Sequence, residues 1–467
     1  MGNITNPRRR EIITDFAKTI QDKKIQSGTT PSKEVIEFRN ERQTGKERTV
    51  VKVPIHLLLY RKDNGRIASD VSTFERIHQP LDEKTEEAQE KLSSFLEKKD
   101  PEKTDELINS IKIHGQRQPA IITADGFLIN GNRRRLAFQK LLDETGEDKY
   151  KYMKVVILPG ENDEGGPPTL QEIEEIENRY QLQSDGKSEY TKFDRALSIR
   201  RKEMNDYPLE KQLKDNPDFA VLGNNEFEKK VKEYREDYLG TLKRIDEYLE
   251  VTNREGVYNC IQEGVGDPEG RWQAFYDFNK SFYKRLKSPY WLEKMGLEEG
   301  EEAKAVDIAY KLIRKREFSG IKLHKIMREL HKWMCKDRAR DELLKLNDID
   351  INLPDKEQFD DDGNEYDERK KDKIWSSLNN EVLHQRVNEA RKHYHYKDTI
   401  EKPIDLLEQA LKKLYHDEMD PEKVDVINDL EKAIEITQEI QERADELESD
   451  FFNIKKRKNN LGNSKRL

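Results

Sequence analysis

The chain of 467 residues has only two cysteines, Cys260 and Cys335, and no apolar run long enough to cross a membrane. Two cysteines cannot form the disulfide framework of a small secreted protein, and they suit a reducing compartment. The start of the chain, "MGNITNPRRR", lacks the apolar core of a secretory signal peptide. We therefore expect a cytoplasmic protein with no membrane partner.

Hydrophobic residues are also few, and the chain carries no excess of positive charge. They make up 34% of the residues, against 39% that are charged, and the formal net charge is -9. This balance is typical of long, solvated helices. It argues against a basic coat for bulk binding of nucleic acid but allows a local basic groove. The cysteine and histidine spacing matches no complete metal-ligand pattern, so no metal site is predicted.

The chain does contain a region of mixed α and β patterns. The runs "VVKVPI", "PAIITADGFLI" and "MKVVILPG" are rich in β-branched residues and predict strands, with a hairpin turn at Asp125–Gly126. Two further runs, "TDELINSIKIHG" and "NRRRLAFQKLLDETG", have helical spacing and are closed by Gly115 and Gly146. We expect an α+β fold whose small mixed sheet is followed by a mainly α-helical region.

Changes in these patterns predict the domain organisation. The chain begins with an amphipathic helix, and its last hundred residues have apolar side chains at 3–4 spacing. The predicted parts are an N-terminal helical arm (1–45), an α+β domain (46–185), a helical domain (186–345), an acidic linker (346–373) and a C-terminal helical hairpin or coiled coil (374–467). The apolar seam of the last part favours a homodimer through these helices.

The stretch "GFLINGNRRRLAFQKL" (126–141) places a tight turn directly before three arginines and an amphipathic helix. The N-terminus of a helix attracts anions, and Gly131 lets a ligand approach the backbone closely. Arginines in a first turn oppose the helix dipole, which makes sense if a multiply charged anion binds there. The alternative is a basic cluster on a solvated helix face, and the local chemistry leaves both readings open.

Two short motifs occur in order around this stretch. Gly115-x-x-Gln118-Pro119 precedes a strand and hairpin, and Gly131-x-x-Arg134-x-x-Ala137 follows them. This order resembles the ParB/sulfiredoxin superfamily, and "VKVPIHLLLYRKDNGRI" resembles that family's opening strand and loop, with Asn64 and Arg66 in the matching places. "ENRYQLQSDGKSEYTKFDRALSIRR" resembles the family's later helical segment. The resemblance covers roughly residues 50–205 and implies a ParB-like fold.

The resemblance implies that the chain binds CTP, or another nucleoside triphosphate, with Mg²⁺. Residues that would border the nucleoside or hold phosphates are Asn64, Arg66, Gly115, Gln118, Pro119, Gly131, Asn132, Arg133, Arg134 and Gln183. Glu177 and Gln181 would face the metal or an attacking water. The chain departs from the family pattern ENxQR, so binding is implied more strongly than hydrolysis. Sulfiredoxin chemistry is excluded because the phosphate loop has no cysteine.

A helix-turn-helix follows the nucleotide-binding domain in ParB proteins. Here "KKVKEYRED" and "LGTLKRIDEYLE" occupy that place, with Lys243 and Arg244 as predicted DNA contacts. The alternative is an ordinary pair of core helices. The aromatic residues of "GRWQAFYDFNKSFYKRL" have helical spacing, which predicts core packing rather than a platform for stacked bases.

The sequence is compatible with three functions. The first is a nucleotide-binding, slowly hydrolysing switch that associates with DNA. The second is a ParB-like nuclease or phosphotransferase, for which Glu174, Glu175 and Glu177 are the candidate metal ligands. The third is a non-enzymatic module that recognises DNA or protein, for example in mobile-element maintenance or phage defence.

Overall fold

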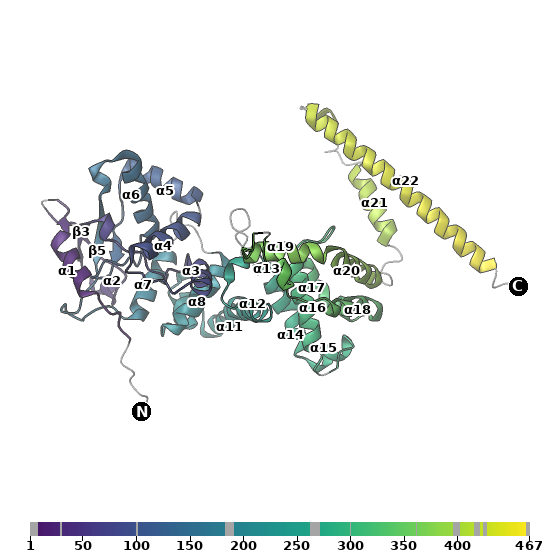
Figure 1. The fold of residues 1–467 in the computed structure, drawn as a ribbon, viewed down its shortest axis with the longest axis horizontal. Coiled ribbons are helices and arrows are strands. Elements are labelled where there is room, and N and C mark those ends of the chain that lie inside the picture. The colour runs from purple at the N-terminus through teal and green to yellow at the C-terminus, as the bar shows by residue number, and fades with distance from the viewer. Residues whose placement is uncertain are drawn as a thin grey trace. The chain divides into compact units, whose positions relative to one another are not determined.

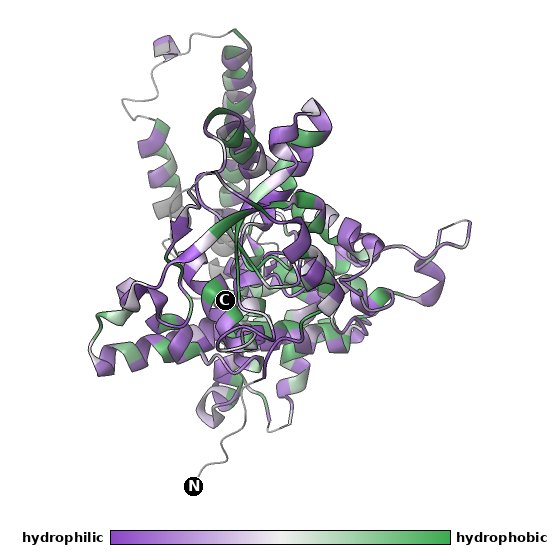
Figure 2. Cartoon of the chain, turned by 90° about the vertical axis from the view of Figure 1, so that its left-hand side faces the viewer, coloured by the Kyte–Doolittle hydropathy of each residue, from purple (hydrophilic) through white to green (hydrophobic). Residues whose placement is uncertain are grey.

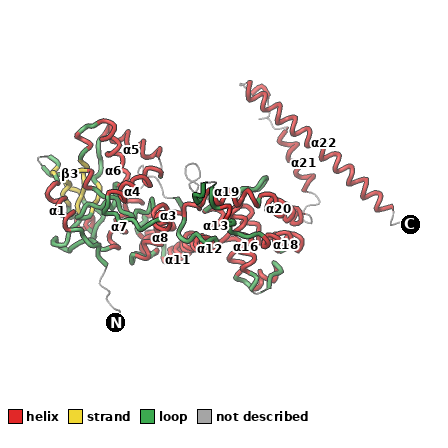
Figure 3. Tube along the Cα trace, in the orientation of Figure 1, coloured by secondary structure: helices red, strands yellow, loops and turns green. Residues whose placement is uncertain are grey.

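The computed structural model describes residues 8–28, 30–99, 101–182, 191–261, 271–298, 300–360, 362–395, 402–414, 421–423 and 427–463. The chain forms two units, Met1–Tyr394 and His395–Leu467, which we call the N-terminal and C-terminal units. The expected α+β class is confirmed at this level, because a small mixed sheet is followed in the chain by many helices (Figures 1 and 3).

The sheet of the N-terminal unit is built around one long strand, β3 (Arg48–Pro54). β5 (Tyr152–Ile157) pairs with β3 antiparallel, and β4 (Ala120–Ile122) pairs with β5 parallel. The other edge of β3 pairs with β1 (Ile25–Gln26) and β2 (Lys33–Glu34). The segment predicted to be a separate helical arm therefore completes the sheet. Its helix, α1, spans Thr14–Lys23.

Helices cover both faces of this sheet. Side chains alternate along β3, so that Val51 and Val53 enter one apolar core while Val50 enters another. The first core is closed by α4 (Glu86–Lys98), α5 (Pro101–His114) and α6 (Asn132–Thr145), and the second by α7 (Leu170–Leu182). Figure 1 shows these helices around the labelled strands. The short helices α2 (Glu41–Thr44) and α3 (Ala68–Ile77) complete this part.

Gly131 precedes α6 and has a left-handed backbone with φ of 89°. A Cβ atom at this position would lie only 2.7 Å from the Cβ of Ala120 in β4. The sequence predicts that this glycine makes room for a ligand, but the atom it makes room for belongs to the neighbouring strand. Gly115, which ends α5, also has a positive φ of 69°, and its missing Cβ faces open space.

These two glycines make a matched pair of variants. Gly115→Ala is expected to lower the free energy of unfolding by about 1 kcal/mol, the cost of a left-handed alanine. Gly131→Ala adds the clash with Ala120 and is expected to cost about 2–4 kcal/mol. Urea denaturation of both variants measures the difference. Equal costs would show that α6 can move away from β4 without penalty.

The rest of the N-terminal unit is helical and packs mainly around a large apolar core, which runs from Phe193 in α8 (Lys192–Met204) to Ala390 in α20 (Asn380–His395). A smaller core is formed by Ile199, Leu209, Leu213 and Val231. Trp272, Phe275, Phe278 and Phe282 are fully buried, so the prediction that the aromatic stripe is core is confirmed. The intervening helices are α9 (Leu209–Lys214), α10 (Pro217–Ala220), α11 (Asn224–Tyr234), α12 (Thr241–Val251), α13 (Trp272–Asp277), α14 (Lys284–Leu286), α15 (Pro289–Lys294), α16 (Glu302–Lys315), α17 (Leu323–Met334), α18 (Asp337–Leu344) and α19 (Glu368–Leu378).

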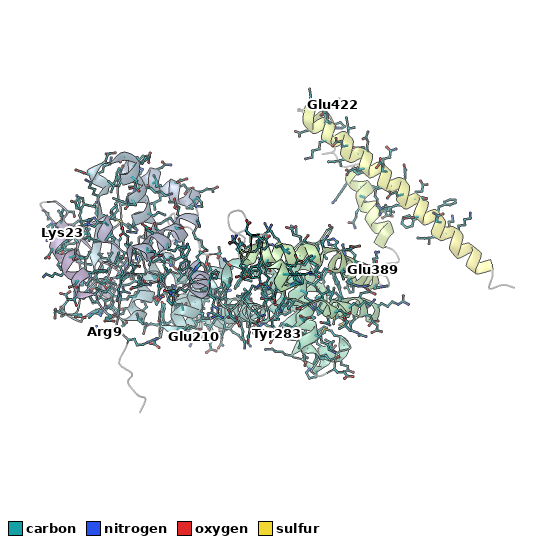
Figure 4. The ribbon with its side chains drawn as sticks, viewed as in Figure 1. Arg9, Lys23, Glu210, Tyr283, Glu389 and Glu422 are labelled. Carbon is teal, nitrogen blue, oxygen red and sulfur yellow. The ribbon has the colours of Figure 1, made fainter. Side chains whose placement is uncertain are left out.

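The predicted helix-turn-helix is wrong. α11 continues through a π-helical turn, Arg235–Gly240, directly into α12, and the residues at both junctions keep right-handed helical angles. No turn separates the two segments. Arg244, predicted to contact DNA, is buried with its guanidinium 3.7 Å from the ring centre of Tyr283, which is labelled in Figure 4. Lys243 is exposed.

The acidic stretch 346–373 is not a free linker. Ile351 and Leu353 are buried in the helical core, and α19 places Asp372 in the same interior. α20 also buries Leu383, Val387 and Ala390 there. The N-terminal unit therefore extends to Tyr394, about twenty residues beyond the predicted boundary at 373.

The C-terminal unit contains α21 (Lys402–Leu414) and α22 (Ile427–Asn463), as expected for two helices. Their described side chains are nearly all exposed, including the apolar ones. Elsewhere hydrophilic residues dominate the visible helix surfaces, in keeping with the low hydrophobic content (Figure 2).

Candidate functional site

The N-terminus of α6 is an uncapped positive helix end. Its first turn contains no acidic residue and no side chain caps it. The first backbone bond of the helix runs from the Arg135 N–H to the Gly131 carbonyl, at 2.9 Å. The preceding Asn130, a residue type that often caps helices, instead accepts from the Ile121 N–H of β4 at 2.8 Å. The first backbone N–H groups of α6 therefore have no acceptor within the helix itself.

The arginines of this turn point in different directions. Arg135 lies 4.0 Å above the Tyr60 ring and donates to the Ile55 carbonyl, so it supports the fold. Arg134 donates to the Gln118 carbonyl at 2.5 Å. Burial of its guanidinium lowers the pKa of Arg134 to about 10, an effect that Tyr180 partly opposes. Within the described ranges no carboxylate pairs with Arg134, although it remains charged at neutral pH.

Among the buried polar atoms that have no hydrogen-bond partner in the described part of the chain, three belong to Asn132, Asn64 and Arg61. They are the Oδ1 of Asn132, the Nδ2 of Asn64 and one Nη of Arg61. The other side of the Asn64 amide accepts from the Arg66 N–H at 3.0 Å. A buried polar atom left without a partner costs about 1–3 kcal/mol, so these atoms indicate a place where a ligand or water supplies the missing partners.

Glu177 lies on α7 and is buried among cations. It pairs with Arg61 at 3.4 Å and with Arg201 at 3.2 Å, and it accepts from the Gly65 N–H and from Gln181. Burial by itself would raise the pKa of Glu177, but Arg201 and Arg61 lower it to about 2. A carboxylate held ionised in this way is a poor proton acceptor. That Glu177 and Gln181 face a metal or an attacking water therefore stays a prediction, since Glu177 is already held by Arg61, Arg201 and the Gly65 N–H.

The same polar residues join α7 to α8. Arg201 also pairs with Glu174 at 2.8 Å, and the ammonium of Lys202 donates to Asn178 at 2.8 Å. Burial lowers the pKa of Lys202 to about 8, although Glu177 and Glu174 raise it. These contacts connect the sheet to the helical core, because α8 buries Phe193 and Ala196 in that core. A change at the sheet can therefore be passed to the helices through α8.

The candidate nuclease ligands are neutralised by neighbouring cations. Glu174 and Glu177 face Arg201, and Glu175 pairs with Lys211 and Arg179. In the part of the chain that the structure describes, no group of three His, Cys, Asp or Glu side chains is arranged to hold a metal ion. The residues present therefore do not fit a resident metal centre, and a nucleotide's Mg²⁺ would have to be held mainly by phosphates and water.

The structure brings the predicted site residues together in two groups. Gln118 meets Arg134, which joins the two motifs around β4. The turn that contains Asn64 and Arg66 meets Glu177 and Gln181 on α7. Gly115 and Pro119 flank Gln118 on the segment that enters β4, and Arg133 is partly exposed on α6. Gln183 lies outside the described residues.

The site also contains Arg61, Arg201 and Lys202, which no local pattern in the sequence indicates. Arg61 pairs with a carboxylate 116 residues away in the chain, and Arg201 pairs with one 24 residues away. A single basic residue in a polar helix or loop carries no local signal for such a partner. The only indication in the sequence is that four glutamates stand on α7 and need cations if they are buried.

Replacing Glu177 by glutamine is expected to destabilise the chain by about 3 kcal/mol at pH 7, because Arg61 then loses the carboxylate that it pairs with in the described part of the chain. The folded-state pKa of Glu177 is below its ordinary value of 4.5, so the ionised form stabilises the fold above that pH. This contribution is lost as the pH falls from about 4.5 towards 2. Urea unfolding of wild type and Glu177→Gln should therefore differ much less at pH 3 than at pH 7. A pH-independent difference would contradict the charge argument, and Gln181→Ala is the control.

None of the helices in the described ranges combines the length and the apolar composition needed to cross a membrane. Comparisons of the chain with protein-family models, with curated proteins and with solved structures found no match. The assignment of the site therefore depends on its own residues and geometry.

Proposed function

We propose that the N-terminal unit binds a nucleoside triphosphate, with CTP the expected nucleotide, and that the start of α6 holds its phosphates. The observation that carries this proposal is Arg134. It lies partly exposed in the first turn of an uncapped helix, and no carboxylate in the described part of the chain pairs with it. A bound phosphate supplies the negative charge and accepts from the first-turn N–H groups.

The surrounding residues support a nucleotide rather than a simple anion. Gln118 and Pro119 stand beside Arg134 on the segment before β4, where the resemblance to ParB proteins implies contacts with the nucleoside. The Nδ2 of Asn64 and the Oδ1 of Asn132, which have no described partner, offer one donor and one acceptor to a base, a sugar or a phosphate. Mg²⁺ would enter with the triphosphate, since the nearby glutamates are already paired with cations.

Nucleotide binding also has a direct route to the helical core. Arg61 has one Nη without a partner while it pairs with Glu177. A phosphate that attracts Arg61 would weaken its ion pair with Glu177. Glu177 would then pair mainly with Arg201 on α8. The proposed function is therefore a binding switch, with DNA as a partner of the nucleotide-bound form. Hydrolysis is not part of the proposal, because Glu177 is unsuited to act as a base.

The test is equilibrium binding of labelled CTP, ATP, GTP and UTP to the full chain with Mg²⁺, in the presence and absence of duplex DNA. We expect one nucleotide to bind with 1:1 stoichiometry, and inorganic tripolyphosphate to compete with it. Absence of binding to all four, with and without DNA, would overturn the proposal. Metal-dependent cleavage of plasmid DNA, tested in parallel, would instead favour the nuclease.

A further inference from the structure

The helix α22 carries an exposed apolar seam with a heptad repeat. It is 37 residues long, and its described apolar side chains include Leu430 at 37% exposure and Phe451 at 44%. Successive a and d positions of the repeat are Leu430, Ala433, Thr437, Ile440, Ala444, Leu447, Phe451 and Ile454. Seven of these eight positions are apolar, and Thr437 is the exception. A mainly apolar series of a and d positions over more than three heptads, with charges beside it, indicates a coiled coil.

The neighbouring helix α21 cannot cover this seam. It has 13 residues, and at 1.5 Å per residue it is about 20 Å long, whereas α22 is about 55 Å long. Its own apolar residues, Leu407, Leu411 and Leu414, are exposed as well. A partner that buries the whole seam of α22 must be a helix of similar length with the same spacing. A second copy of α22 meets this requirement.

We propose that α22 forms a parallel, in-register coiled coil with α22 of a second copy of the chain. In this arrangement each g residue faces the e residue of the next heptad on the other helix. Arg443 at g then faces Glu448 at e, and Asp450 at g faces Lys455 at e. Both pairs have opposite charges, and each occurs twice in the dimer.

An antiparallel arrangement fits the same charges poorly. When the two seams overlap fully in that direction, g residues face g residues, and Arg443 meets Arg443 of the second copy. Like charges at such positions are destabilising. The seam thus indicates a dimer, and the charges beside it select the parallel direction. This inference does not depend on nucleotide binding.

Sedimentation equilibrium of the full chain tests the dimer and its direction. We expect twice the chain mass of 55.3 kDa. Arg443→Glu and Glu448→Arg are at exposed positions, and each alone is expected to raise the dimer Kd about 10-fold or more. An equimolar mixture of the two variants restores both pairs in a heterodimer and should recover wild-type affinity. A monomer at all concentrations, or a mixture no tighter than its components, would overturn the proposal.

Oxidative cross-linking gives an independent readout of direction. In a Cys335→Ser background, where Cys260 is buried, Leu430→Cys should form an intermolecular disulfide because residue 430 meets its own copy. In the overlapped antiparallel dimer the two cysteines would be about 36 Å apart and could not react. Ser449→Cys, at the outward f position, is the control. A cross-link at 449 but not at 430 would refute the parallel coil.

Discussion

Arg134→Ala is expected to weaken nucleoside triphosphate binding at least about 100-fold without destabilising the fold. A guanidinium that grips a phosphate makes two charge-assisted hydrogen bonds, each worth about 1.5–3 kcal/mol, and about 3 kcal/mol corresponds to more than a hundredfold in Kd. In the ligand-free protein the same side chain makes one hydrogen bond, to the Gln118 carbonyl, and no described carboxylate pairs with it. Its removal therefore relieves an uncompensated charge. Nucleotide titration and a thermal melt measure both effects.

The control for this variant stands one residue away. Arg135→Ala removes the same charge from the same helical turn, but that side chain packs on Tyr60 and bonds to Ile55. It is expected to lower the melting temperature and to leave the affinity within a few-fold of wild type. Arg134→Lys keeps the charge but loses the bidentate hydrogen bonding of a guanidinium, so its nucleotide affinity should lie between those of wild type and Arg134→Ala. If Arg134→Ala binds normally, or both alanine variants lose affinity equally, the phosphate does not sit on Arg134.

Asp372→Asn is expected to destabilise the N-terminal unit by about 3–5 kcal/mol, the largest effect on stability that we predict. Asp372 is buried at the centre of three arginines, Arg254 at 2.8 Å, Arg271 at 2.5 Å and Arg314 at 3.1 Å. Burial alone would raise its pKa, but Arg271, Arg254 and Arg314 lower it to about 2. An asparagine leaves three buried guanidiniums without their shared counter-charge. Urea denaturation measures the loss.

The same helix supplies the matched control. Asp367 is exposed and caps the N-terminus of α19 through a bond from the Lys370 N–H. Asparagine is an equally good cap, so Asp367→Asn should change the free energy of unfolding by less than about 0.5 kcal/mol. If Asp372→Asn changed the free energy of unfolding by a similarly small amount, water or a bound anion would have to reach the arginine cluster.

Local patterns in the sequence correctly predicted several elements near the site. β-branched alternation gave β3 and β5, and helical spacing with a closing glycine gave α6, which ends at Gly146 with a left-handed backbone. These predictions succeeded because period and end signals are carried by residues close together in the chain. The order of motifs also placed Gln118 and Arg134 in one site, and the hydrogen bond between them agrees with that placement.

Other features were decided only by the tertiary structure. The sequence between α11 and α12 has polar residues and Gly240, as a turn would, but in the structure it is a π-helical turn in which Gly240 lies close to Asn279. The acidic stretch 346–373 has the composition of a linker, yet its Asp372 is buried and pairs with arginines that lie 101 and 118 residues away in the chain. The pairing of Glu177 is equally long-range.

By itself, the sequence predicted many of the strands and helices near the site and the positions along the chain of the residues that we propose to hold phosphate. The tertiary structure decided which charges are neutralised inside the protein and which remain available to a ligand. The physical reason is that secondary structure depends on neighbours within a few residues, whereas the ionisation and availability of a side chain depend on whichever groups the fold places within a few ångströms. Arg134 and Arg244 illustrate this, because both are arginines near a predicted helix start. Arg134 pairs with no described carboxylate, whereas Arg244 is buried against the ring of Tyr283.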